Sequence, residues 1–126
     1  MTKKGTILVV DDNKTILQTL RLLLNGYFER VLTIASPNRI DTVLREEAVD
    51  IVLLDMNFSA GINSGNEGIY WLARIKKINA NIPVVVFTAY ADIDLAVRAI
   101  KEGAADFVAK PWDNKKLIAT LLAAYN

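Results

Sequence analysis

The sequence predicts an α/β fold in which a doubly wound, five-stranded parallel sheet is covered by helices on both faces. Short runs rich in β-branched residues alternate along the chain with stretches whose apolar residues recur at helical spacing. Several of these runs are apolar throughout, which is typical of strands buried on both faces of a parallel sheet. A chain of 126 residues, 52% of them hydrophobic, can build one such core. We therefore expect a single domain over residues 1–126.

The strands and helices are expected to follow one another in a (βα)5 order. The predicted strands are 6–11, 31–35, 50–55, 83–88 and 106–109. The first helix begins after Asn13, a common capping residue, and ends near Gly26. Ser36 and Pro37 begin the second, since proline suits the first helical position.

Apolar spacing also places the last three helices. The third carries its buried residues at Ile69, Leu72 and Ile75. The fourth carries apolar residues at helical spacing before a turn at Gly103, namely Ile93, Ala96, Val97 and Ile100. Asp113 can cap the fifth.

The segment from Met56 to Gly68 is rich in glycine, asparagine and serine, which predicts the one long loop of the chain. It follows the third strand directly. We expect residues 58–67 to form a partly ordered flap near the site, with Phe58 and Ile62 as apolar anchors. The alternative is a passive insertion without a role at the site.

The composition excludes several classes of function. The chain has no histidine and no cysteine, so imidazole and thiolate metal ligation, Ser-His-Asp catalysis and disulfides are excluded. Its net charge of +1 indicates neither a nucleic-acid footprint nor a polybasic membrane surface. No apolar run reaches the length of a membrane span, and no secretory segment is present, so we expect a cytoplasmic protein whose partners are proteins or small ions.

Polar residues stand where four of the predicted strands end. Asp11 and Asp12 follow the first strand, and Asp55 closes the third. Thr88 ends the fourth strand, and Lys110 follows the fifth. Because the carboxyl ends of parallel strands lie at one edge of a sheet, where ligand crevices form, these side chains are expected to converge on one site.

Such a set of side chains suits metal-assisted phosphoryl transfer. Neighbouring carboxylates repel one another unless a cation shares their site, and ligation by oxygen alone favours Mg²⁺ or Mn²⁺. Magnesium often binds one or two carboxylates together with phosphate oxygens. Lys110 can neutralise a phosphoryl group, Thr88 can donate to it, and a metal-held aspartate can attack phosphorus.

Each residue has a structural interpretation when it is taken alone. Asp11 and Asp12 could be a solvated helix-capping pair, and Asp55 could simply close a strand. Thr88 could be chosen for its β propensity, and Lys110 could be a surface lysine. The conjunction of these groups at four strand ends favours the functional interpretation.

The same residues resemble the motifs of receiver domains from two-component response regulators. The matching motifs are Asp11-Asp12, Asp55, Thr88-Ala89 and Lys110-Pro111, each at a strand end. The resemblance covers essentially the whole chain and implies a flavodoxin-like receiver fold. It also implies a phosphoacceptor switch rather than an enzyme, with a sensor histidine kinase as partner.

The resemblance assigns a role to each matching position. Asp55 would be the phosphoacceptor. Asp12 would bind Mg²⁺ directly, Asp11 would bind it largely through water, and the backbone carbonyl of Asn57 would be a further ligand. Lys110 would pair with the phosphoryl group, and two residues would respond to it, Thr88 as the switch hydroxyl and Phe107 as the switch aromatic.

The match departs from the family pattern beside the phosphoacceptor. Ser59 stands where the family usually has proline, and the matching Gly68 comes about five residues late, so the loop is enlarged. Segments 55–58, 66–68, 87–92 and 110–113 are similar to receivers that head enhancer-binding transcription activators working with the nitrogen-type sigma factor.

Two other functions fit the sequence less well than a switch does. A Mg²⁺-dependent aspartyl-phosphate phosphatase would have a second aspartate two residues after its nucleophile, whereas residues 11 to 13 read Asp-Asp-Asn, and we expect no cap domain. A flavin or nucleotide module would need a glycine-rich phosphate loop, which the sequence lacks.

The resemblance further implies that phosphorylation reshapes the surface formed by residues 91–102 and 113–125. Because charged residues of both signs lie on this face, which suits a symmetric contact, phosphorylation is expected to promote a homodimer through it. No direct binding of nucleic acid or membrane by this domain is expected.

Overall fold

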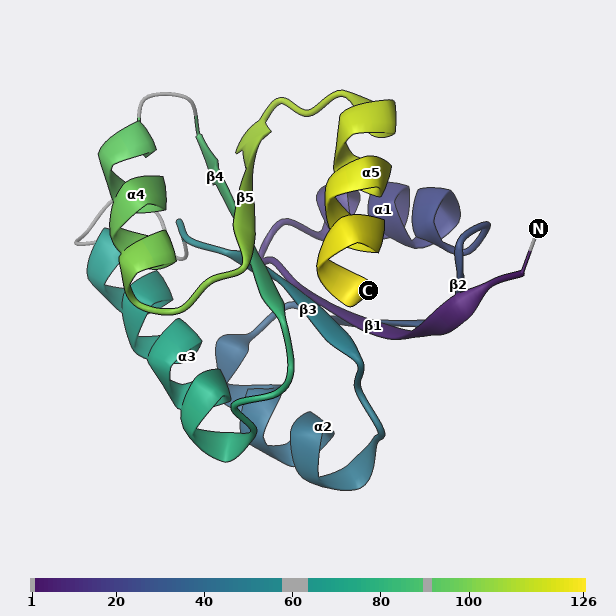
Figure 1. Cartoon of the computed structure of the whole chain (residues 1–126), viewed down its shortest axis with the longest axis horizontal. Coiled ribbons are helices and arrows are strands. Elements are labelled where there is room, and N and C mark those ends of the chain that lie inside the picture. Colours follow the sequence, from purple (N-terminus) through teal and green to yellow (C-terminus); the bar gives the residue numbers. More distant parts are fainter. Residues whose placement is uncertain (1, 58–63, 90–91) are drawn as a thin grey trace.

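The computed structural model describes residues 2–57, 64–89 and 92–126 of the chain (Figure 1). Its strands and helices alternate as the sequence predicts. In chain order they are β1 (Lys4–Val10), α1 (Lys14–Leu24), β2 (Phe28–Ile34), the 3-10 helix η1 (Pro37–Arg39), α2 (Ile40–Glu46), β3 (Ile51–Asp55), α3 (Ser64–Ile78), β4 (Val84–Ala89), α4 (Ile93–Lys101), β5 (Asp106–Lys110) and α5 (Asn114–Tyr125).

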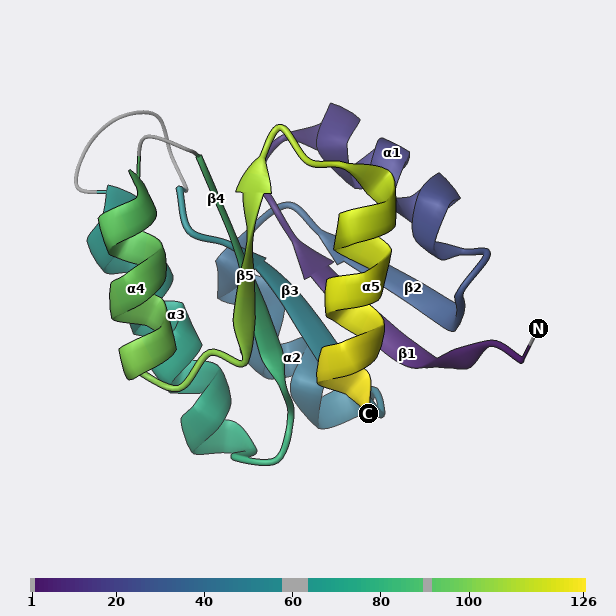
Figure 2. The ribbon, with the colours of Figure 1, turned by 45° about the horizontal axis from the view of Figure 1, so that its top comes forward.

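The five strands form one parallel sheet in the order β2-β1-β3-β4-β5. Helices α1 and α5 cover one face, and α2, α3 and α4 cover the other (Figure 2). The chain winds from β1 outward to β2 and then crosses to β3 on the other side, so the order reverses between β1 and β3. The predicted doubly wound α/β fold is confirmed, and the reversal places a crevice at the carboxyl ends of these two strands.

Strand β1 explains why the strand sequences are apolar throughout. Ile7 and Val9 pack in the cluster under α1 and α5, whereas Leu8 and Val10 pack in the cluster under α2, α3 and α4. All four side chains are fully buried. A strand covered on both sides needs apolar residues at both phases of its pleat, so no polar alternation remains.

The predicted helix starts are confirmed at three positions. Asn13 accepts hydrogen bonds from two backbone amides of α1, at 2.9 and 3.1 Å. Ser36 caps η1, and Asp113 caps α5 through the amide of Lys116. Strand β2 begins three residues earlier than predicted, because Phe28 is fully buried and lies opposite Lys4 of β1.

The long loop is shorter than the sequence predicts. Helix α3 begins at Ser64, so the last part of the predicted loop is helical. Glu67 lies in its first turn, where a negative side chain stabilises the helix by interacting with the positive end of its dipole. The expected flap falls largely on residues 58–63, which lie outside the described residues.

Gly68 lets α3 approach the end of β3 closely. A Cβ atom at this position would lie 2.8 Å from Cα and 2.9 Å from the carbonyl oxygen of Met56, the buried residue after Asp55. These contacts are with backbone, which cannot move aside as a side chain could. The late glycine of the sequence therefore sets the distance between α3 and the strand that bears Asp55.

We expect Gly68→Ala to destabilise the fold by about 1–2 kcal/mol, because overpacking costs more than the gain in helix propensity. Gly26→Ala is the matched control, since a Cβ there meets only the Leu23 carbonyl oxygen at 3.7 Å. Urea denaturation of both variants measures the difference. Equal stability of the two variants would show that the approach at Gly68 is not tight.

Helix α4 divides its apolar residues unequally between core and solvent. Ala96 and Ala99 are fully buried, whereas Ile93, Val97 and Ile100 are 41%, 48% and 40% exposed. Small residues thus face the sheet and branched ones face outward.

None of the helices in the described parts of the chain combines the length and apolar character needed to span a bilayer.

Candidate functional site

The polar residues at the strand ends converge as predicted. Asp11 and Asp12 follow β1, Asp55 ends β3, and each offers a carboxylate oxygen within 4.8 Å of the other two. Thr88 lies in β4, and Lys110 is the last residue of β5. The site lies at the carboxyl edge of the sheet, beside the point where the strand order reverses.

Lys110 joins two of the carboxylates. Its Nζ donates to Oδ2 of Asp11 at 2.8 Å and to Oδ1 of Asp55 at 3.0 Å. Both aspartate side chains are 1% exposed, and that of Lys110 is 20% exposed. The ammonium group also lies 4.9 Å from the centre of the Phe87 ring. One cation on the last strand therefore holds carboxylates from two other strands in a mostly buried ion-pair network.

The buried position sets the ionisation of the pair. Burial raises the pKa of Asp55 above its usual value, and Asp11 raises it further, while Lys110 opposes both. Burial acts to lower the pKa of Lys110, but hydrogen bonds and attraction from Asp11 and Asp55 outweigh it and raise that pKa. Lys110 is thus held as a cation, and the charge on Asp55 is incompletely compensated.

The two oxygens of Asp55 differ in their contacts. Oδ1 accepts from Lys110 and from the backbone N–H of Asn57, at 3.2 Å. Oδ2 is buried, and among the described residues it makes no hydrogen bond. A buried carboxylate oxygen with free lone pairs is costly unless a ligand completes it. Together with the neighbouring carboxylates, this oxygen fits a hard cation or an electrophilic phosphorus atom.

Asp11 and Asp12 differ in their surroundings. Both oxygens of Asp11 already accept hydrogen bonds, Oδ1 from the amide of Asn13 at 2.8 Å and Oδ2 from Lys110. Asp12 is exposed at the mouth of the site. The two carboxylates are adjacent in the sequence, but only the fold separates a buried structural anion from an accessible one.

The side chain of Asn57 was missed by the sequence analysis, which considered only its carbonyl. Its Nδ2 donates to Asp92 Oδ2 at 3.0 Å, and its Oδ1 accepts from the fully buried Thr88 hydroxyl at 3.4 Å. Asp92 was also missed as a neighbour of the site, since it was assigned only to an outer face. Residues 57 and 92 lie 35 positions apart, so no local pattern could have paired them.

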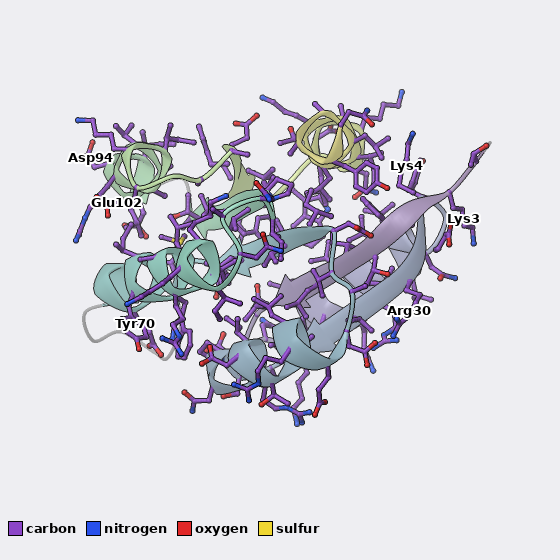
Figure 3. The ribbon with its side chains drawn as sticks, turned by 60° about the horizontal axis from the view of Figure 1, so that its bottom comes forward. Lys3, Lys4, Arg30, Tyr70, Asp94 and Glu102 are labelled. Carbon is purple, nitrogen blue, oxygen red and sulfur yellow. The ribbon has the colours of Figure 1, made fainter. Side chains whose placement is uncertain are left out.

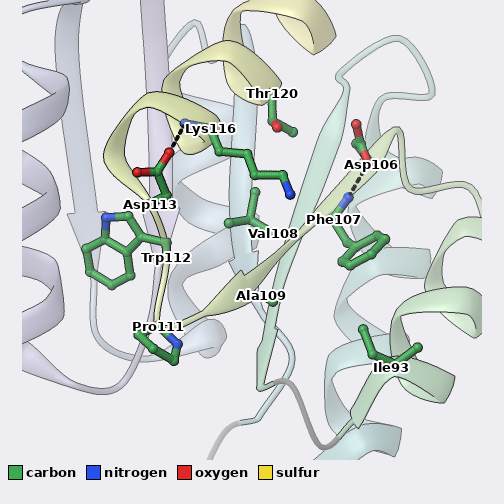
Figure 4. Close-up of a pocket in the computed structure, with 10 residues that line it drawn as sticks. All are labelled: Ile93, Asp106, Phe107, Val108, Ala109, Pro111, Trp112, Asp113, Lys116 and Thr120. Atoms are coloured by element: carbon green, nitrogen blue, oxygen red, sulfur yellow. Dashed lines mark hydrogen bonds between the residues drawn. The ribbon is translucent and has the colours of Figure 1, made fainter.

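Phe107, the expected switch aromatic, lines a separate cavity of about 490 Å³ between α4, β5 and α5 (Figure 4). Its ring is half-buried and lies toward Ile93 at the start of α4. On the far side the cavity is bounded by Lys116 and Thr120 of α5. Phe107 lies opposite Val86 in the register of β4 and β5, two residues before Thr88 along β4.

Comparison with known proteins identifies the family. The model of the response regulator receiver domain matches residues 7–122. The chain is 39% identical over 118 residues to the transcriptional regulatory protein ZraR of Klebsiella oxytoca, covering 94% of this chain and 26% of that protein. It is 31% identical over 117 residues to the DNA-binding transcriptional regulator NtrC of Salmonella typhimurium, covering 93% and 24%. The chain thus spans about a quarter of the length of these relatives.

Solved structures agree with this match. The N-terminal signal receiver domain of a two-component system response regulator from Bacteroides fragilis superposes with a TM-score of 0.90 at 57% identity, covering 98% of both chains. The receiver domain of NtrX from Brucella abortus gives a TM-score of 0.85 at 29% identity, covering 94% of this chain and 97% of that one. These matches do not favour the alternative of a phosphatase, and the chain belongs to the response regulator receiver domain family, whose members act as switches in two-component signalling.

Proposed function

We propose that Asp55 accepts a phosphoryl group from a phosphohistidine of a sensor kinase, with Mg²⁺ in the site, and that the domain heads an enhancer-binding transcription activator in the cytoplasm. The observation that carries the proposal is the state of Asp55, whose Oδ1 is held by Lys110 while its buried Oδ2 has no hydrogen-bond partner in the described parts of the chain. The names of the matched relatives, both transcriptional regulators, support the assignment of the output.

The carboxylates of Asp12 and Asp55 and the carbonyl of Asn57 would hold the ion directly, with Asp11 acting through water. Two observations support this difference between direct and water-mediated binding: both oxygens of Asp11 already accept hydrogen bonds, and Asp12 is exposed. When bound, Mg²⁺ offsets the negative charge of the carboxylates and of the incoming phosphoryl oxygens.

In the transfer, an oxygen of Asp55 forms a bond to phosphorus while the P–N bond of the donor breaks, and the electron pair of that bond stays on the imidazole nitrogen. Lys110 and Thr88 donate hydrogen bonds to the phosphoryl oxygens. Water later attacks the phosphorus, the bond to Asp55 breaks, and inorganic phosphate leaves. The chain thus catalyses only its own phosphorylation and dephosphorylation.

The proposal is tested by intact-mass measurement after incubation with acetyl phosphate and Mg²⁺. We expect the mass of one phosphoryl group on the wild type and none on Asp55→Asn or in EDTA. A phosphorylated protein in EDTA, or Asp55→Asn modified at the wild-type rate, would overturn the assignment.

Metal affinity should separate the two acidic residues after β1. Loss of a residue that acts on a metal through another ligand typically lowers metal affinity about 10–100-fold. We expect an effect of this kind for Asp11→Ala, and Asp12→Ala, which removes a direct ligand, should weaken Mg²⁺ binding more. Trp112 can report binding, because its ring lies 5.3 Å from the Phe87 ring beneath Lys110. Titration in a Trp71→Phe background isolates this signal, and the reverse order of affinities would contradict the ligand assignment.

The outer face of α4 supports a second part of the proposal, phosphorylation-promoted dimerisation through α4, β5 and α5. Ile93, Val97 and Ile100 expose a branched apolar stripe beside the cavity lined by Phe107. Charged residues of both signs surround it, and Figure 3 shows Asp94 of α4 and Glu102, the C-cap of this helix, projecting outward. A self-complementary contact between two copies would bury the apolar stripe and pair these charges.

Sedimentation velocity with and without beryllofluoride tests the dimer. We expect the phosphoryl mimic to shift the wild type toward dimer, and Val97→Asp or Thr88→Ala to remain monomeric. Leu22→Asp is the matched control, because Leu22 is 81% exposed on α1, on the other face of the sheet. A monomeric wild type at high concentration would contradict this output and leave a receiver that acts on a different partner.

A further inference from the structure

Asn57 connects the phosphoacceptor to the start of α4 through three hydrogen bonds. Its backbone N–H donates to Asp55 Oδ1, and its side-chain oxygen accepts from Thr88. Its side-chain nitrogen donates to Asp92 Oδ2 at 3.0 Å. One amide side chain thus links the ends of β3 and β4 to the residue that precedes α4.

Asp92 occupies the N-cap position of α4 without capping it. Its side chain makes no hydrogen bond to the backbone amides of the helix, and its φ and ψ of −111° and 37° lie outside the extended region usual for this position. By contrast, Asn13, Ser36 and Asp113 each accept a backbone N–H of the helix that they begin. Among these four residues at described helix starts, only Asp92 uses its side chain to accept a hydrogen bond from a residue distant in the sequence.

We propose that Asp92 is a positioning residue that exchanges partners, holding Asn57 in the unphosphorylated domain and capping α4 once Thr88 leaves Asn57. The inference rests on the proposed function, in which Thr88 donates to the phosphoryl group on Asp55. The Thr88 bond to Asn57 is long, at 3.4 Å, and the hydroxyl has one hydrogen to donate. Donation to a phosphoryl oxygen therefore removes it from Asn57.

Both arrangements of Asp92 give its carboxylate a hydrogen-bond donor. In one, its carboxylate accepts a hydrogen bond from a side-chain amide. In the other, it would accept backbone N–H groups at the positive end of α4, which is a favourable site for an anion. Since each arrangement satisfies the same charged oxygen, loss of the Thr88 bond that holds Asn57 is sufficient to shift the populations.

The exchange would link the site to the output face. A cap on α4 steadies the first turn of the helix, which carries Ile93 at the edge of the exposed apolar stripe. Because such coupling is reciprocal, a chain whose Asp92 already caps α4 should also hold its phosphoryl group differently. Asn57 and Asp92 would then set how strongly phosphorylation and the α4 face depend on one another.

The test is NMR measurement of amide exchange with water at Asp94 and Leu95, the amides an N-cap side chain would accept. In the unphosphorylated, metal-free protein, Asn57→Ala and Asp92→Ser should slow this exchange about three- to tenfold, as expected for a gained cap. Serine caps a helix well but lacks the length of aspartate to reach Asn57. Asp92→Ala, which can do neither, should show no slowing, and the Lys116 amide, capped by Asp113, is the internal control.

Wild-type protein with beryllofluoride should show the same slowing as Asn57→Ala. Unchanged exchange in both Asn57→Ala and Asp92→Ser would overturn the exchange of partners. Slowing in those variants but not with beryllofluoride would overturn its coupling to phosphorylation. Because the variant measurements need neither metal nor phosphoryl group, they are independent of the mass test of Asp55, and the two proposals can fail separately.

Discussion

Lys110→Ala is expected to lower the phosphorylation rate about 100-fold, an effect typical of removing one donor aimed at developing charge. The residue is the cation that contacts both Asp11 and Asp55. Its loss also leaves two buried carboxylates without their counterion. We expect the free energy of unfolding to fall by about 3 kcal/mol, the lower end for a broken buried ion pair, because Asp55 can take up a proton.

Two variants separate charge from side-chain loss in this experiment. Lys110→Arg keeps a cation between the carboxylates and should retain most of the stability, while its different shape still slows transfer. Lys77→Ala removes an exposed lysine of α3 and should change neither quantity. Rates come from intact mass against time with acetyl phosphate, and stabilities from urea denaturation. A Lys110→Ala protein with wild-type rate would show that the ammonium group does not contact the phosphoryl group.

Asp55→Asn is expected to raise the Tm at neutral pH in EDTA. Burial holds the pKa of Asp55 above its usual value, so its charge opposes folding. Below the unfolded pKa the residue is protonated in both states, and wild type and variant should be alike. As the pH rises through the raised folded pKa, Asp55 becomes charged and the free energy of unfolding of the wild type falls, whereas that of the variant does not. The Tm difference should be about 3–6 °C for each kcal/mol by which the variant raises the free energy of unfolding.

Asp41→Asn provides a control of opposite sign. A hydrogen bond from Arg74 at 2.7 Å links α2 to α3 and holds the pKa of Asp41 below its usual value. Its charge therefore contributes stability that is present above the unfolded pKa and is lost as the pH falls through the folded pKa. We expect Asp41→Asn to be less stable than wild type at neutral pH and to approach it in acid. Parallel behaviour of the two variants would show that burial of Asp55 does not penalise its charge.

Addition of Mg²⁺ should reverse the order of Tm between the wild type and Asp55→Asn. A ligand that binds only the folded state stabilises it in proportion to the logarithm of its concentration above Kd. The wild type retains the carboxylate that completes the acidic cluster with Asp11 and Asp12, so it should gain more than Asp55→Asn. Equal gains would place the ion elsewhere.

The sequence by itself determined the sheet, its covering helices and the convergence of the site. Fully apolar strands require cover on both faces, and parallel strands bring their carboxyl ends to one edge. Asp11, Asp55, Thr88 and Lys110 could therefore be placed together without coordinates. The caps at Asn13 and Asp113 were equally readable, because an N-cap depends on the few residues that follow it.

Only the tertiary structure decided which of these groups are buried. Asp11 and Asp12 are neighbours of the same type, but Lys110 reaches across the sheet to Asp11 and leaves Asp12 exposed. The spacing of α4 marks an apolar stripe without saying which arc faces the sheet, and packing turned the alanines inward and the branched residues outward. The pairing of Asn57 with Asp92 depends on where β3 and β4 end in space, and that distance is set by the whole core rather than by either segment.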